Sequence, residues 1–177
     1  MLAYNAGITW LCNEQVFRAM KAKGLIDDLG YPKFFDEVYG PHRSEIPEKY
    51  RGRYARALWL TDAVHQVGGL AIFAHPYWQP KNVRVHNVRD QLAKMFLTSG
   101  MFDVYELVGA MSQVGINRSI NLWADLRAEG LKISIVGSSD VHNLEKSATF
   151  SHTFTVCFAE KNENDAIIDA VRAGRTV

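Results

Sequence analysis

The chain has 177 residues, of which 47% are hydrophobic and 22% charged, and its formal net charge is +1. This length allows one domain with a sizeable core, and the charge gives no electrostatic support for binding nucleic acid or a membrane surface. No apolar run is long enough to cross a membrane, and the first residues lack the pattern of a signal peptide. Cys12 and Cys157 lie far apart among apolar residues, so we expect buried thiols in a reducing cytoplasm.

The sequence divides into an irregular, partly helical N-terminal segment (residues 1–43) and an α/β unit (residues 44–177). In the first segment, a helix is expected over 13–24 with Asn13 as its N-cap, followed by a loop rich in Gly and Pro.

In the second segment, apolar residues at helical spacing alternate with short apolar runs. The spacing predicts helices over 44–67, 87–99, 115–129 and 162–174, the last capped by Asn162. In the third of these helices the predicted inner stripe is Ile116, Ile120, Trp123 and Leu126. Buried strands are expected over 70–74, 102–108 and 131–136, and further β segments over 153–158 and 175–177.

This order of elements favours βα units, a mainly parallel sheet and helices outside it. In such folds ligands bind at the carboxyl ends of the strands. His75, Asp140 and His142 each follow a predicted strand. We therefore expect them to meet at one edge of the sheet.

The segment after residue 136 carries the most specific chemistry. Its small residues, Gly137 to Ser139, allow a tight turn before Asp140. On extended backbone, residues two apart point to the same side, so Asp140 and His142 are predicted to enter one pocket. A carboxylate and an imidazole suit zinc, iron or manganese. The alternative, in which Asp140 caps a turn and His142 is a surface residue, remains open on this motif alone.

Three motifs together resemble the PHP (polymerase and histidinol phosphatase) family. Residues 68–76, with the sequence GGLAIFAHP, are similar to the family's segment that ends in Ala-His-Pro. Residues 102–107 resemble the strand that follows, and residues 137–142, GSSDVH, resemble the last metal motif. The resemblance covers about residues 44–177.

The resemblance implies a (β/α)7 barrel, here a partial one, with up to three divalent metal ions at the carboxyl ends of its strands. His75, Asp140 and His142 match metal ligands, and Asp140 and His142 also match catalytic positions. Glu106 matches a residue that lines the pocket. Family members that stand alone are mostly phosphoesterases, so the resemblance implies a metal-dependent phosphoesterase of small phosphorylated substrates.

The chain also departs from the family pattern. It contains no HxH motif, with which the family begins. Its 177 residues also fall short of the roughly 250 that a barrel of βα units takes. We therefore expect a C-terminal piece of a longer protein, which associates with itself or with the missing N-terminal part. The alternative to an enzyme is an inactive fragment that acts as an association module.

Several residues near the expected site have weaker roles. Lys81, Arg84 and Arg118 are candidates for contacting substrate phosphate, although solvated surface charges are the more common case. Tyr77 and Trp78 either stack on a substrate or pack over the mouth of the barrel. His86 is a weaker candidate, and His152 is expected at the opposite face.

Overall fold

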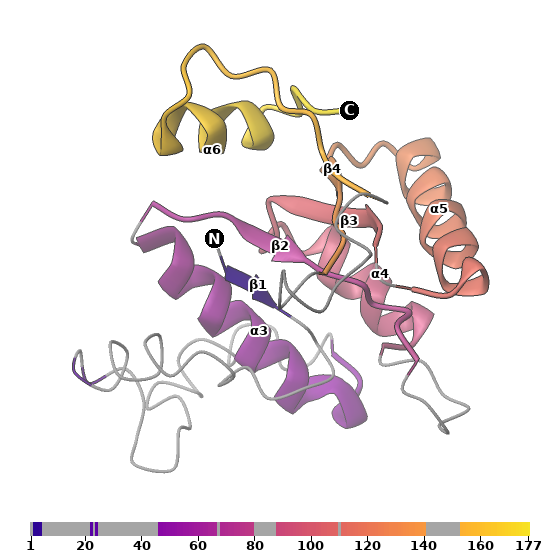
Figure 1. Ribbon diagram of the computed structural model, residues 1–177. Helices are drawn as coiled ribbons and strands as arrows, with labels where there is room; N and C mark the ends of the chain where they lie inside the picture. Colours follow the sequence, from indigo (N-terminus) through magenta and orange to yellow (C-terminus); the bar gives the residue numbers. More distant parts are fainter. Residues whose placement is uncertain are drawn as a thin grey trace.

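The computed structural model describes residues 2–4, 22, 24, 46–66, 68–79, 88–109, 111–140 and 153–177. Within these ranges the chain has a mixed α/β fold (Figure 1). The predicted helix over 13–24 lies outside the described residues, except that Ala22 is helical and Gly24 lies in a turn with φ +68°. The predicted boundary between residues 43 and 44 also lies outside them.

The strands form one parallel sheet in the order β1-β2-β3-β4. They are β1 (Leu2–Tyr4), β2 (Ala71–Phe73), β3 (Val104–Val108) and β4 (Ser134–Gly137). The predicted parallel arrangement is therefore confirmed. The sheet formed by these strands is open, so a closed or partial barrel stays a prediction.

Three helices pack on one side of the sheet (Figure 1). They are α3 (Glu48–Gln66), α4 (Asp90–Thr98) and α5 (Gln113–Ala128). Phe73 of β2 and Tyr105 of β3 point into this core, where the Phe73 ring meets Phe96 of α4 edge-on at 5.4 Å between centroids. None of the helices in the described ranges is both long and apolar enough to cross a membrane.

The opposite face of the sheet packs against α6 (Asn164–Arg172). Side chains alternate along a strand, so Ile72 and Val104 project away from the large core and meet Val171 of α6. As predicted, Ala170 and Val171 are buried. The N-cap of α6 is Glu163 rather than the predicted Asn162, and it makes no side-chain capping bond.

Gly68 ends α3 as the sequence predicts. Its φ of +75° lies in the left-handed region that glycine adopts readily. The Gly69 N–H donates to the Val64 carbonyl at 2.9 Å, and the Gly68 N–H donates to the His65 carbonyl at 2.9 Å. These two bonds form a Schellman motif, which turns the chain directly into β2.

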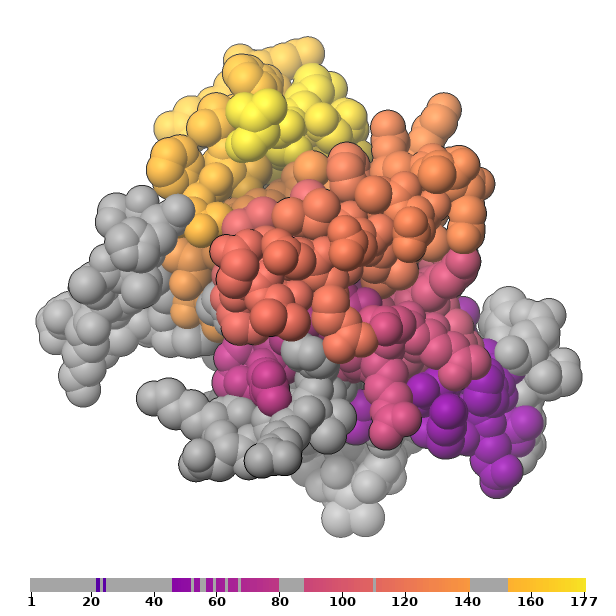
Figure 2. Space-filling model, turned by 90° about the vertical axis from the view of Figure 1, so that its right-hand side faces the viewer, coloured from indigo at the N-terminus to yellow at the C-terminus, as the bar shows by residue number. Residues whose placement is uncertain are grey.

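The inner face of α5 differs from the prediction. The helix begins at Gln113 instead of residue 115, because the Ser112 hydroxyl caps it by accepting from the Gly115 N–H at 3.2 Å. The predicted inner residue Leu126 is buried, but Ile120 is 39% exposed, and Gly115 and Ser119 are buried in addition. A Cβ on Gly115 would lie 3.0 Å from the Tyr77 carbonyl oxygen, so glycine is favoured at this position of α5. Figure 2 shows the outer side of α5, in orange, on the surface of the molecule.

The third predicted buried strand, β4, is only half-buried along its length, because it has a paired strand on one side only among the described residues. The β segments predicted at 153–158 and 175–177 do not join the parallel sheet. They are extended and pair antiparallel with each other, with Val156 and Val177 exchanging N–H···O bonds of 2.7 and 3.0 Å. Cys157 in this ribbon is half-buried, not buried as expected, and its thiol donates to the Ile167 carbonyl at 3.8 Å.

Candidate functional site

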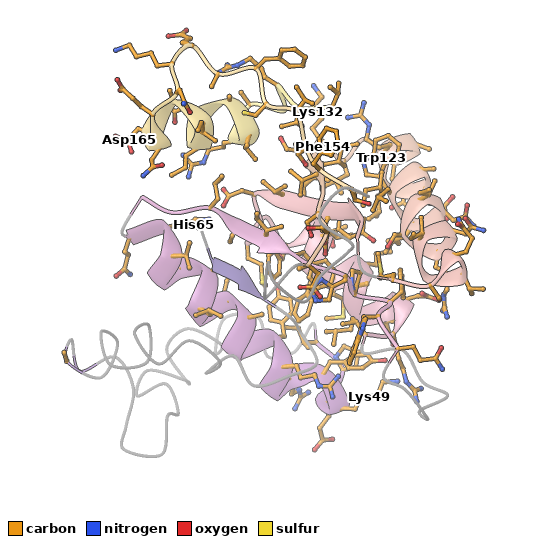
Figure 3. All side chains as sticks on the ribbon, viewed as in Figure 1. Lys49, His65, Trp123, Lys132, Phe154 and Asp165 are labelled. Atoms are coloured by element: carbon orange, nitrogen blue, oxygen red, sulfur yellow. The ribbon has the colours of Figure 1, made fainter. Side chains whose placement is uncertain are left out.

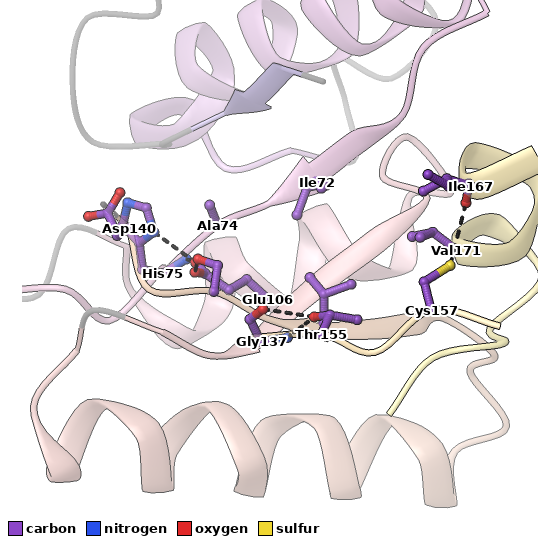
Figure 4. Close-up of a pocket in the computed structure, with 12 residues that line it drawn as sticks. Ile72, Ala74, His75, Glu106, Gly137, Asp140, Thr155, Cys157, Ile167 and Val171 are labelled. Atoms are coloured by element: carbon purple, nitrogen blue, oxygen red, sulfur yellow. Dashed lines mark hydrogen bonds and ion pairs between the residues drawn. The ribbon is translucent and has the colours of Figure 1, made fainter. Parts of the chain in front are cut away.

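A cavity of about 280 Å³ lies on the face of the sheet that α6 covers (Figure 4). One end is apolar and is lined by residues of β2, β4, α6 and the antiparallel ribbon, among them Ile72, Val136 and Val171. The other end is polar and lies where the parallel strands end. It is lined by His75, Glu106, Ser138 and Asp140.

His75 follows β2 and is held by Glu106 of β3. The His75 Nδ1 lies 2.7 Å from Glu106 Oε2, and the His75 backbone N–H donates to the same oxygen at 2.5 Å. Only 9% of His75 is exposed. One carboxylate oxygen therefore fixes both the ring and the main chain of this histidine.

Glu106 itself is a buried carboxylate in an otherwise apolar strand. It is 1% exposed, and its second oxygen, Oε1, accepts a hydrogen bond from the Ser138 hydroxyl. Three donors thus surround it, from residues that follow β2 and β4. Burying a charge is costly unless it is hydrogen-bonded, and these donors provide that compensation.

The family resemblance predicts that Glu106 lines a pocket, and Glu106 does line this cavity, but the resemblance does not predict its contacts. Ser138 was expected only as a turn former. A glutamate at an inward position of an apolar strand was the available signal for a buried polar network.

His75 and Asp140 both have left-handed backbone. Their φ angles are +29° and +52°. Such angles are uncommon outside glycine, although Asp and His adopt them more often than other residues, and they cluster at functional sites. The extended backbone predicted through residues 140–142 is therefore wrong at Asp140, where the chain turns as β4 ends.

The electrostatics of the polar end favour a charged imidazole. Burial alone would lower the pKa of His75, but the hydrogen bond to Glu106 and the charges of Glu106 and Asp140 outweigh it and raise the pKa above 6.5. Figure 4 shows the Asp140 carboxylate beside the His75 ring. The negative charge around the ring also makes its nitrogen a better ligand for a cation.

The predicted metal ligands are brought together in part. His75 and Asp140 line the same cavity, while His142 lies outside the described residues. The two donors have the right chemistry for zinc, manganese or iron. In the parts of the chain that the structure describes, no group of three or more His, Cys, Asp or Glu side chains is placed to hold a metal ion. A complete site would need donors beyond them.

Two of the other candidate residues, Tyr77 and Arg118, contact neighbouring side chains of the fold. Tyr77 is 1% exposed and belongs to the large core, which supports packing rather than stacking on a substrate. Arg118 lies over the Tyr77 ring at 5.0 Å and donates to Asp90 at 2.6 Å, so its guanidinium is already engaged. Trp78 is partly exposed and its role stays open. Lys81, Arg84, His86 and His152 lie outside the described residues.

In comparisons with known proteins, no family model, no curated protein and no solved structure matches this chain. The resemblance to the PHP family therefore rests on the three motifs alone, and it stays a prediction.

Proposed function

We propose that this chain carries part of the active site of a metal-dependent phosphoesterase that hydrolyses small phosphate esters. The observation that supports this most strongly is the meeting of His75 and Asp140 in one cavity at the carboxyl edge of a parallel sheet. In parallel α/β folds this edge is where ligands bind. Glu106 supplies the carboxylate that metal-binding histidines usually have on their other ring nitrogen.

The proposal assigns a separate task to each side chain. Divalent metal ions in such a site would polarise the phosphoryl oxygens and lower the pKa of water. His75 would contact a metal through Nε2, since Nδ1 faces Glu106. Asp140 would provide an oxygen ligand from the end of β4. His142, which follows in the GSSDVH segment, would supply a further nitrogen, and the remaining donors would come from residues beyond the described ranges or from another chain.

The test is hydrolysis of p-nitrophenyl phosphate by the full chain with added Mn²⁺ or Zn²⁺. Where the remaining metal donors are supplied, by this chain or by an added protein that carries the HxH motif, we expect metal-dependent turnover that Asp140→Ala abolishes. Asp125→Asn, which alters an exposed carboxylate of α5, is the matched control and should retain the activity. A folded chain without turnover in either metal, alone and mixed with a protein that supplies the HxH motif, would contradict the proposal.

A second candidate function is an association module, and one surface favours it. The antiparallel ribbon exposes Phe154, Val156 and Phe158 at alternate positions, and Val177 lies opposite Val156. Phe154 and Phe158 are 70% and 59% exposed. Figure 3 labels Phe154 in the upper part of the view, where Trp123 and Lys132 are also labelled. Neighbouring exposed apolar side chains of this size are typical of protein interfaces.

We propose a second copy of this chain as the partner of that ribbon. Size-exclusion chromatography with light scattering should then give a dimer or larger species that Phe158→Ser dissociates. Val114→Ser, which removes an exposed apolar side chain from α5, should leave the assembly unchanged. A stable monomer at micromolar concentration would contradict this candidate.

A further inference from the structure

We propose that Glu106 is the positioning residue of this site: it fixes His75 in the tautomer with a proton on Nδ1, so that Nε2 is the nitrogen offered to a metal. The inference rests on the proposed function as far as the metal is concerned. The orientation of the imidazole can be tested without any metal. Sequence motifs alone did not assign Glu106 a contact with His75.

The first step of the argument is the geometry around Glu106 Oε2. This oxygen lies 2.7 Å from His75 Nδ1 and 2.5 Å from the His75 backbone nitrogen. A carboxylate accepts hydrogen bonds, so the contact with Glu106 favours a neutral His75 ring that carries its proton on Nδ1. The opposite nitrogen, Nε2, then has the lone pair that binds a metal.

The second step is that Glu106 has little freedom to move away. It is 1% exposed, and its Oε1 accepts from the Ser138 hydroxyl. The backbone of Gly109 also lies close to the Glu106 carboxyl group, since a Cβ on Gly109 would lie 2.7 Å from the Glu106 Cδ. The carboxylate is thus confined on several sides and can hold a ring whose backbone is itself left-handed.

The third step separates positioning from plain structural support. Glu106 contacts residues after β2 and after β4, so removing it would also weaken the fold. If the carboxylate were merely structural, its removal would lower the free energy of unfolding without changing the tautomer of His75. The experiment must therefore read the imidazole itself.

We would label the full chain with ¹⁵N-histidine and record the ring nitrogen shifts at a pH where His75 is neutral, using His75→Gln to assign the signals. We expect the Nδ1–H tautomer in the wild-type chain. Glu106→Met, which has similar length but no strong acceptor, should lose this preference, and Glu106→Gln, which keeps one acceptor oxygen, should restore part of it. An unchanged tautomer in Glu106→Met would overturn the proposal.

The second readout is the affinity for Zn²⁺, measured by competition with a chromophoric chelator. Loss of an outer partner of a metal-binding histidine typically weakens metal binding about 10–100-fold, and we expect this for Glu106→Gln. If Glu106→Met does not fold, Glu106→Gln decides the matter: equal Zn²⁺ affinity would overturn the positioning role. If the wild-type chain binds no Zn²⁺, the proposed function fails, while the tautomer comparison still decides the role of Glu106.

Discussion

Replacing Gly109 by alanine tests how tightly the Glu106 carboxylate is held. The added Cβ would lie 2.3 Å from Glu106 Oε1 and 2.7 Å from Cδ, well inside van der Waals contact. The φ angle of Gly109 is not among the positive ones, so alanine fits the backbone and the conflict is with the side chain alone. An exposed glutamate would rotate away at little cost. Glu106 is buried and accepts three hydrogen bonds, so it cannot move without losing some of them.

Overpacking of this kind typically costs about 1–3 kcal/mol. In a chain of this size each kcal/mol lowers Tm by roughly 2–4 °C. Urea denaturation of four proteins measures the effect: the wild type, Gly109→Ala, Glu106→Ala and the double variant. Glu106→Ala removes the obstructing atoms, so Gly109→Ala should cost little in that background, which gives a coupling energy of about 1 kcal/mol or more. Equal costs in both backgrounds, or a Gly109→Ala variant as stable as the wild type, would refute the reasoning.

Three further predictions concern the rest of the described structure. Ser112→Ala removes the N-cap of α5 and should lower the free energy of unfolding by about 0.5–2 kcal/mol, whereas Ser112→Asp should retain most of it; urea titration measures both. Asp103→Ala should cost about 1–3 kcal/mol in the same assay, because Asp103 Oδ2 accepts from the Ala71 N–H at 2.7 Å and lies 2.8 Å from His65 Nε2. The pKa of His75 is raised above 6.5 in the folded protein, so protonated His75 stabilises the fold. This stabilisation is complete below about pH 6.5, the pKa in the unfolded chain, and is lost as the pH rises through the pKa of the folded protein. The chelator-treated chain should therefore lose stability above that pH, and His75→Gln should remove this part of the dependence; identical pH profiles for the two proteins would contradict it.

The alternation of strands and helices could be predicted from residue 44 onward because each apolar run is bounded by glycine. Gly68 and Gly130 illustrate this, since both have positive φ and both stand where a helix gives way to the next strand. The same logic placed His75 and Asp140 at one edge of the sheet, because parallel strands end on the same side. These inferences need only local signals and the rule that connects them.

The inner face of α5 could not be predicted because it depends on the approach of another segment. Hydrophobicity favours Ile120 as an inner residue, yet the close passage of Tyr77 favours glycine at position 115, and Ser119 is buried instead of Ile120. Periodicity cannot reveal how near two elements come.

The hydrogen bonds of Glu106 could not be predicted from the sequence either, because they join distant parts of the chain. Ser138 and His75 lie 32 and 31 positions away from it in the sequence, and only the register of the sheet brings them to one carboxylate. The pairing of residues 153–158 with 175–177 likewise depends on how the chain returns after α6.

Arg172, the last residue of α6, connects the amino ends of three strands. Its guanidinium donates to the Gly69 carbonyl at 3.0 Å and lies 3.6 Å from the Asp103 carboxylate, and its own carbonyl accepts from Ser134 Oγ at 3.1 Å. Glu106 connects the same three strands near their carboxyl ends, so polar contacts tie the strands together at both edges of the sheet. Substitutions near the carboxyl ends of the strands should therefore leave the strand register intact as long as the contacts of Arg172 are kept.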